Sequence, residues 1–431
     1  MRSRLAVKPL IWATLALCLL GGALRFAYPS EVPLIFDEAL LLHRALDDNS
    51  AGVWTTYGLR GSRGVDYGPV PILFYRGLLA LTHDPVTLAL GKIASVTFLT
   101  ALAVWLLLRT CPWIPPWTAV FVFCSPYFWN YARDLWDNSL NIPLTALYFS
   151  TYVAFLATHK KRWYAVSVLL GATALQVHLM VLPLVLALAS HFVLFEKRWW
   201  KKQWLAVLAI HIVAALLLAP YLWHFLTTSR TPLPLAPGLA MFQGVFGLLG
   251  GRVFTALGFE YFFGPYWYGV WGALPMAITA VALVCVFAGM GRAWTLVKMR
   301  RQTLETSVAW ICLVGLALHV LIATVQQLTN HPHYYSSVWI LFFCFLGMGL
   351  ARLGGRRLWK ALGIASGLGL FLSLANAAAF AHAGKAESRP HYGRFLSLQM
   401  KQARASCSNP PESQTQSPQA LLRRLLCSTS R

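Results

Sequence analysis

The sequence predicts an all-α polytopic membrane protein with about 11 transmembrane helices. Hydrophobic residues make up 58% of the chain and charged residues 12%, roughly half of the charged fraction of a soluble domain. Several apolar runs reach the roughly 20 residues that a helix needs to cross the hydrocarbon core. Short basic clusters separate these runs, which is typical of loops on the cytoplasmic side of a membrane.

The expected spans form one transmembrane domain, residues 1–382. We place them at 9–29, 86–109, 114–131, 138–158, 163–177, 178–195, 203–226, 268–290, 306–326, 334–352 and 358–382. Basic residues precede the first span, but its apolar run is long and no small-x-small cleavage site follows. We therefore interpret it as an uncleaved anchor.

Residues 69–82 form an apolar segment that is too short for a span and contains Arg76. Counting it as a span would invert every later loop and place the lysine clusters outside. We therefore expect an interfacial helix in the outer leaflet. It belongs to an external loop, residues 30–85, that carries juxtamembrane helices.

The charge distribution supports this orientation, with the N-terminus inside. All of the 14 acidic residues except Glu196 and Glu305 then lie outside. The basic loops fall inside, so the net charge of +22 reflects topology and predicts no nucleic-acid partner. Residues 383–431 form a polar tail that we expect to be external and disordered. The sequence leaves open whether Cys407 and Cys427 in this tail pair.

Asp37 and Glu38 are the first candidate catalytic residues, directly after the first span. A carboxylate at this boundary can take a proton from a hydroxyl while the other substrate stays anchored in lipid. The structural alternative is a helix cap before residues 39–44, because acidic side chains favour the positive end of a helix. Spacing alone leaves both open.

The second candidate is the turn from Tyr131 to Asn138. Arg133 could hold a phosphate through bidentate bonds, and Asp137 could orient a sugar hydroxyl or Arg133. The alternative is a solvated turn with a local ion pair. His178 lies alone in the break between two short spans, where a packing role is the alternative to a functional one.

A fourth group, His331, His333, Tyr334 and Tyr335, lies at the expected outer end of two late spans. It offers a contact surface for phosphate or sugar, with an ordinary aromatic belt as the alternative. The two histidines are separated by Pro332 and lack a third ligand nearby. We therefore predict no cofactor, with a divalent metal as the alternative. The sequence also lacks a Walker-type phosphate loop and a D-x-D motif on a cytoplasmic loop.

These segments together resemble the GT-C membrane glycosyltransferases, specifically bacterial relatives of protein mannosyltransferases and of the aminoarabinose transferase of lipid A. The matching segments are Phe36-Asp37-Glu38, Tyr67-Gly68-Pro69-Val70-Pro71, Tyr131-Ala132-Arg133 with Asp137, Gln176-Val177-His178 and His333-Tyr334-Tyr335. The resemblance covers about the first 200 residues and residues 326–352. It implies an acidic pair after the first span, with Tyr67 at the start of an interfacial helix.

Two departures concern the donor phosphate. The aminoarabinose transferase carries an Arg three residues after its Asp and a Lys before the loop proline, where this chain has Leu40 and Gly68. Another cation must then contact the phosphate, and the candidates are Arg133, Arg63 and His178. Aminoarabinose is therefore a doubtful donor.

The resemblance implies a glycosyltransferase that uses a polyprenyl-phosphate sugar at the outer face of the bacterial cytoplasmic (inner) membrane. Asp37 would act as general base with inversion, and the acceptor would be a lipid, a glycan or a protein. One alternative is a transporter or lipid flippase, which would place ionisable groups near the bilayer midplane. Another is a lipid-linked glycan ligase or polymerase, with key residues in a late external loop.

Overall fold

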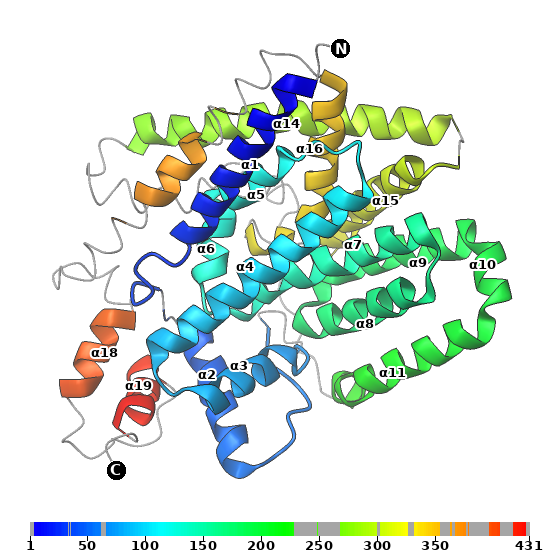
Figure 1. The fold of residues 1–431 in the computed structure, drawn as a ribbon. Coiled ribbons are helices and arrows are strands. Elements are labelled where there is room, and N and C mark those ends of the chain that lie inside the picture. Colours follow the sequence, from blue (N-terminus) through cyan, green and yellow to red (C-terminus); the bar gives the residue numbers. More distant parts are fainter. Residues whose placement is uncertain are drawn as a thin grey trace.

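The computed structural model in Figure 1 describes most of the chain as a bundle of helices. The described residues are 4–32, 34, 36–61, 66–227, 248, 268–299, 302–325, 332–353, 363, 367–375, 378, 396–405 and 417–427. In these ranges the regular elements are all helical, and the extended pairing consists of an isolated bridge between Arg60 and Asp66. The predicted all-α class is confirmed.

The first half of the chain supplies α1 (Arg4–Leu24), α2 (Phe36–Ala51), α3 (Val70–Leu81), α4 (Pro85–Thr110), α5 (Thr118–Phe123), α6 (Pro126–Arg133), η1 (Asp137–Leu140), α7 (Asn141–Thr158), α8 (Lys161–Val177), η2 (Leu179–Val181), α9 (Leu182–Phe195), α10 (Lys197–Lys202) and α11 (Trp204–Thr227). The second half supplies α14 (Tyr268–Lys298), α15 (Leu304–Val325), η5 (Pro332–Ser337), α16 (Trp339–Leu353), α18 (Leu396–Ala405) and α19 (Pro418–Cys427).

The protein is a multi-pass membrane protein. Within the described part, 5 helices are long and apolar enough to cross a bilayer: Pro85–Thr110, Asp137–Thr158, Trp204–Thr227, Met276–Lys298 and Leu304–Val325. Shorter apolar helices occupy Trp12–Leu24, Val70–Leu81, Leu179–Phe195 and Trp339–Leu353. The eleven spans remain a prediction, and the last of them, 358–382, is described only in part.

The span expected at 114–131 is not a continuous helix. It divides into α5 and α6 at Cys124-Ser125-Pro126. Pro126 cannot donate a backbone hydrogen bond to the preceding turn, and the Ser125 hydroxyl accepts the Tyr127 N–H at 3.2 Å as the cap of α6. The break directs α6 into a short segment whose C-terminal turn carries Arg133.

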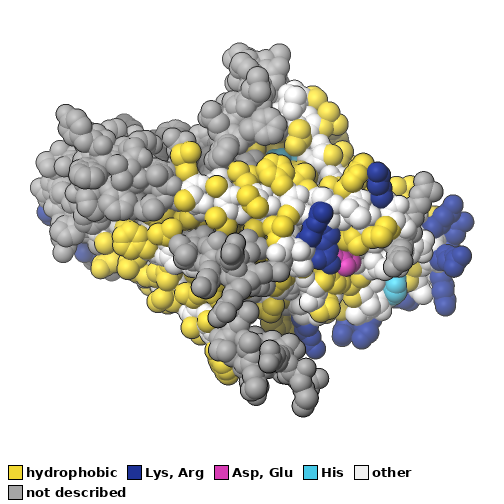
Figure 2. All heavy atoms as spheres, turned by 90° about the horizontal axis from the view of Figure 1, so that it is seen from above, with side chains coloured by type: hydrophobic (Ala, Val, Ile, Leu, Met, Phe, Trp, Pro, Cys, Tyr) yellow, Lys and Arg dark blue, Asp and Glu magenta, His cyan; other side chains and the backbone are white. Residues whose placement is uncertain are grey.

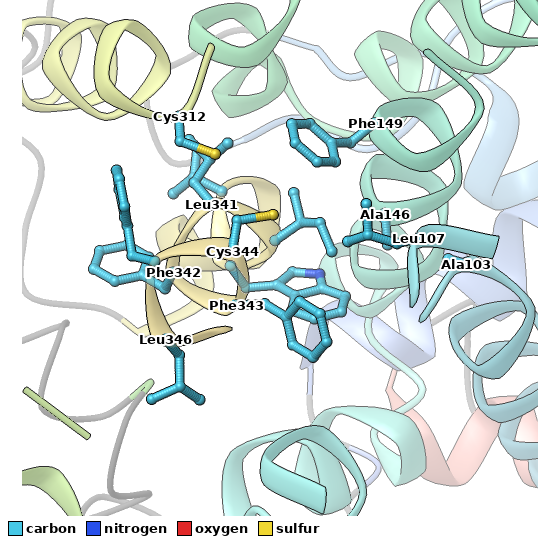
Figure 3. Close-up of a cluster of buried hydrophobic side chains, with 14 of the residues drawn as sticks. Ala103, Leu107, Ala146, Phe149, Cys312, Leu341, Phe342, Phe343, Cys344 and Leu346 are labelled. Atoms are coloured by element: carbon cyan, nitrogen blue, oxygen red, sulfur yellow. The ribbon is translucent and has the colours of Figure 1, made fainter. Parts of the chain in front are cut away.

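Helix α16 lies in the middle of the packed core. In Figure 3, Leu341 and Phe343 of α16 lie among labelled residues of α4, α7 and α15, such as Leu107, Phe149 and Cys312. These side chains are buried, as expected for a helix that is apolar on all faces. At the end nearest η5, the indole of Trp339 donates to the Ile142 carbonyl at 3.0 Å and joins α16 to α7.

Helices α14 and α16 approach each other through two glycines. A Cβ on Gly289 would overlap the Phe345 carbonyl, and a Cβ on Gly349 would overlap the Cys285 carbonyl. We expect Gly349→Ala to lower the thermal unfolding temperature in detergent, although alanine in a helix interior normally gains about 1 kcal/mol over glycine. The control is Gly77→Ala on α3, where a Cβ meets nothing within 4 Å. Equal stability of the two variants would contradict the close approach.

Charge separates the two ends of the bundle. Helix α10, which contains Lys197, Arg198, Lys201 and Lys202, lies far from α2, α18 and α19 (Figure 1). Figure 2 shows Lys and Arg side chains gathered at one end of the visible face, with hydrophobic side chains along its middle. This pattern agrees with basic loops on one side of a membrane.

The tail differs from the disordered segment expected for 383–431, because two parts of it are helical. Leu421, Leu422 and Leu425 of α19 are buried in one apolar cluster with residues of α2 and α3. Burial of such leucines is worth roughly 1.5–3 kcal/mol each, which stabilises a helix too short to persist alone. Cys427 at its end is disulfide-bonded, whereas Cys407 and the proline-rich stretch before α19 lie outside the described residues.

Candidate functional site

Helix α2 carries the two first candidates in its first turn. Asp37 is exposed and Glu38 is buried, with 4% of its surface accessible. Neighbouring protein atoms partly desolvate the Asp37 carboxylate and raise its pKa. A carboxyl that is accessible and more basic than usual is suited to accept a proton from a hydroxyl.

Glu38 differs from Asp37 because it is buried. Burial raises the pKa of Glu38 well above its usual value, and the negative charge of Asp134, which lies directly after α6, raises it further. The Trp136 N–H donates to Asp134 Oδ1 at 3.2 Å. The catalytic role expected for Glu38 stays a prediction. The sequence reasoning did not single out Asp134, although it lies in the same acidic turn as Asp137.

The Lys92 side chain of α4 holds the end of α6 and the residue after it through their backbone carbonyls. Its ammonium donates to the carbonyls of Tyr131 at 2.7 Å and Ala132 at 3.1 Å, and also to the Asp134 carbonyl. A cation at the last carbonyls of a helix is favourable because they carry partial negative charge. Tyr131 contributes its carbonyl here, while its buried ring contacts Tyr127 with 4.7 Å between centroids.

Arg133 is placed differently from the phosphate contact expected from the sequence. The side chain is 1% exposed. It donates to the carbonyls of Arg25 at 3.2 Å, Tyr28 at 2.8 Å and Glu31 at 2.9 Å, and to that of Ala27. These carbonyls belong to the turns that join α1 to α2, so Arg133 organises the backbone leading to Asp37.

Asp137 opens η1, and its side chain is 2% exposed. Its Oδ1 accepts the Asn138 N–H at 2.7 Å. Tyr67 approaches from the external loop, where its backbone pairs with Gly58 and Leu59 at 2.7 and 2.9 Å. Burial raises the pKa of Tyr67, and Asp137, Tyr334, Asp37 and Tyr221 raise it further. The charges of Asp37 and Asp137 therefore both act on the Tyr67 hydroxyl.

The Tyr67 hydroxyl is 3.1 Å from Nε2 of His178. The His178 Nδ1 accepts the Met180 N–H at 3.1 Å, so a neutral imidazole carries its hydrogen on Nε2. Nε2 then donates to the Tyr67 oxygen, and the Tyr67 O–H can donate to a further acceptor. The ring of Tyr334 in η5 lies 6.1 Å from the His178 ring. Segments far apart in sequence thus meet at this point.

Gly68 explains one departure from the aminoarabinose transferase. A Cβ at this position would overlap the backbone and Cβ of Gln176 at the end of α8. The loop therefore packs directly on the α8 break, and a lysine does not fit there without movement. Gln176 in turn donates to the Leu217 carbonyl of α11 at 3.4 Å.

A contact between the external loop and α11 was not expected from the sequence. Asp66 Oδ2 accepts from His224 Nε2 at 2.7 Å. The His224 ring stacks on Tyr57 with 3.9 Å between centroids, and the Arg44 guanidinium lies 4.7 Å from the Tyr57 centroid. The two residues of this pair are more than 150 residues apart, so their contact cannot be predicted from local sequence spacing. The contact joins the external loop next to Tyr67 to α11.

Three expected site residues lie wholly or partly outside the described part of the chain. Arg63 and His331 lie outside the described residues, and His333 is described in its backbone alone. Among the side chains that the structure places, no group of three or more His, Cys, Asp or Glu is arranged to hold a metal ion. The divalent metal therefore remains an untested alternative.

No protein-family model matches this sequence, and no curated protein is detectably similar to it. Solved structures are similar in fold. ArnT from Cupriavidus metallidurans in the apo state superposes with a TM-score of 0.60 at 12% identity, over 98% of this chain and 85% of that chain. The same protein bound to undecaprenyl phosphate gives a TM-score of 0.57 at 13% identity, with the same coverage. ArnT is an aminoarabinose transferase of the GT-C family, so the expected resemblance to GT-C glycosyltransferases is confirmed at the level of the fold.

Proposed function

We propose that this protein transfers a sugar from a polyprenyl-phosphate donor to an acceptor hydroxyl at the outer face of the cytoplasmic membrane. The observation that carries the proposal is the exposed Asp37 carboxylate in the first turn of α2, where protein atoms raise its pKa. It lies in a fold shared with a protein that was crystallised with undecaprenyl phosphate. A membrane-anchored donor suits a site on a juxtamembrane helix.

In the proposed reaction, Asp37 accepts the proton of the acceptor hydroxyl. The acceptor oxygen forms a bond to the anomeric carbon, and the bond from that carbon to the phosphate oxygen breaks. The electron pair leaves with polyprenyl phosphate, and the configuration at the anomeric carbon inverts. The raised pKa of Asp37 makes it a stronger base than an ordinary carboxylate.

The remaining residues orient the sugar and offset charge on the leaving phosphate. Asp137 accepts from sugar hydroxyls, and the Tyr67 O–H with His178 behind it donates to an oxygen of the donor. Tyr334 lies beside His178, with 6.1 Å between the ring centroids. Arg63, His331 and His333 remain the candidates for contacts to phosphate, because Arg133 donates to backbone carbonyls instead. Electrostatic contacts of this kind are usually the largest catalytic contribution.

Two observations support an extracytoplasmic position of the site. The basic helix α10 lies far from α2 (Figure 1), and basic loops favour the cytoplasmic side. Helix α19, which packs beside α2, contains the disulfide-bonded Cys427. Stable disulfides are typical of oxidising compartments outside the cytosol.

The test is transfer by the purified protein in lipid vesicles. A panel of polyprenyl-phosphate sugars, neutral hexoses and pentoses beside aminoarabinose, is offered together with lipid, glycan and peptide acceptors. We expect release of polyprenyl phosphate from a neutral sugar donor, and a product of inverted anomeric configuration by NMR. Intact donors throughout the panel, together with no binding of free undecaprenyl phosphate, would contradict the proposal.

A further inference from the structure

The chain segment that leads into α2 is bonded on two sides at Glu31. Arg133, at the end of α6, donates to the Glu31 carbonyl at 2.9 Å. The Ser397 hydroxyl, in the first turn of α18, donates to the Glu31 carboxylate at 2.7 Å. Glu31 is buried, so both bonds are shielded from water. The residue just before the helix that carries Asp37 is thus held by the transmembrane domain and by the tail together.

The backbone of the same segment is also bonded to the tail. The bonds run from Leu396 N–H to the Val32 carbonyl at 3.0 Å, from Ser397 N–H to the Ser30 carbonyl at 2.9 Å and from the Gln399 side-chain amide to the Leu34 carbonyl at 3.3 Å. The first N–H groups of a helix have no partner within it. The start of α18 therefore uses these groups to fix the carbonyls of the segment before α2.

Apolar packing joins the tail to two parts of the candidate site. Leu396 of α18 and Leu422 of α19 are buried in one cluster with Leu42 of α2 and Leu135, and the two tail helices lie beside α2 (Figure 1). Leu135 belongs to the turn that ends at Asp137. The helix that presents one proposed site carboxylate and the turn that presents the other therefore share a core with the tail.

We propose that the tail helices α18 and α19 are a positioning module for sugar transfer, which acts on Asp37 through the bond between Ser397 and Glu31. The inference rests on the proposed function. Ser397 and Glu31 do not contact a substrate in this scheme. They fix the backbone that sets the direction of Asp37, and a misplacement of a reacting group by about 1 Å can lower a rate by about 10²-fold.

Ser397→Asp breaks the central contact while it keeps α18. An acidic residue in the first turn of a helix is favourable, but the new carboxylate has no hydrogen to donate and repels that of Glu31. With a polyprenyl-phosphate hexose or pentose as donor, we expect kcat to fall by about 10–10²-fold and the KM for the donor to stay nearly unchanged. The matched control is Gln419→Asp, which adds the same charge to the first turn of α19 at an exposed position, where the glutamine bonds Gln402. It should transfer at the wild-type rate.

Glu31→Gln provides a rescue. Alone, it still accepts from the Ser397 hydroxyl through its amide oxygen, so transfer should stay within about threefold of the wild type. Combined with Ser397→Asp, its amide N–H₂ donates to the new carboxylate, and kcat should return to that of Glu31→Gln alone. In an Asp37→Asn background, Ser397→Asp should cause no further loss, because both changes then act through one group. Failure of the rescue, or a full additional loss in that background, would overturn the positioning role.

Amide hydrogen exchange separates this inference from the proposed function. In Ser397→Asp, peptides that cover residues 30–40 should exchange about tenfold faster than in the wild type, peptides of α16 should keep their rate, and Glu31→Gln should restore slow exchange. If Ser397→Asp does not fold, Ser397→Ala gives the same readout with a smaller increase. Unchanged exchange refutes the inference whether or not transfer is detected. Faster exchange in a protein that transfers no sugar refutes only the proposed function.

Discussion

Replacing Asp37 by Asn is expected to reduce sugar transfer by about 10²–10⁴-fold, the usual contribution of a general base. The amide has nearly the same shape, but it cannot accept the proton of the acceptor hydroxyl. The exposed position of Asp37 leaves the packing of α2 undisturbed, so the thermal unfolding temperature should stay close to that of the wild type. Single-turnover rates with bound donor provide the measurement.

Asp47→Asn is the matched control, since it makes the same chemical change on the same helix. Asp47 lies at the surface and contacts Arg424 at 2.7 Å, an exposed pair worth about 0–1 kcal/mol. We expect its transfer rate to match the wild type. Transfer by Asp37→Asn at the wild-type rate would remove Asp37 from the role of base.

Replacing Arg133 by Met is expected to destabilise the protein rather than to weaken donor binding alone. Four backbone carbonyls between Arg25 and Glu31 lose a charged donor. The Tyr28 carbonyl keeps the Glu31 N–H at 2.9 Å, and each of the others that stays buried without a partner costs about 1–3 kcal/mol. Arg133→Lys should also be destabilised, because one ammonium cannot reproduce the planar fork of a guanidinium. Thermal unfolding in detergent and the yield of folded protein report the effect.

Arg109→Met serves as the comparison, because Arg109 is exposed at the end of α4 and stacks only on Trp105. Its unfolding temperature should change little. If Arg133→Met instead kept the wild-type unfolding temperature and raised the KM for the donor, Arg133 would contact phosphate after all. The two outcomes distinguish the structural role from the one that its charge suggests in the sequence.

The sequence predicts the long elements well, because their signal is local. Apolar runs of more than 20 residues identify α4 and α15, and the proline pair at Pro69 and Pro71 marks the start of α3. The break inside 114–131 is not predicted, because the apolar composition continues across Ser125 and Pro126. In α19, the leucine spacing is helical, but the surrounding polar residues hide it.

The site was predictable in its residue types and less so in their partners. Tyr67 and His178 do meet, at 3.1 Å, and the charge of Asp37 acts on the same Tyr67 hydroxyl. Arg133 and Glu38 look alike from the sequence, as charged groups near a membrane boundary. Their contacts depend on a turn more than 100 residues away for Arg133 and on Asp134 for Glu38. Composition and spacing do not encode such separations.

The tail that packs on α2 has a consequence for biosynthesis. The Leu396 N–H donates to the Val32 carbonyl at 3.0 Å, and the Ser397 hydroxyl donates to Glu31 at 2.7 Å. These bonds secure the backbone that leads into Asp37, and residues 396–427 leave the ribosome long after it. Helix α2 therefore lacks these contacts until translation of the chain is nearly complete.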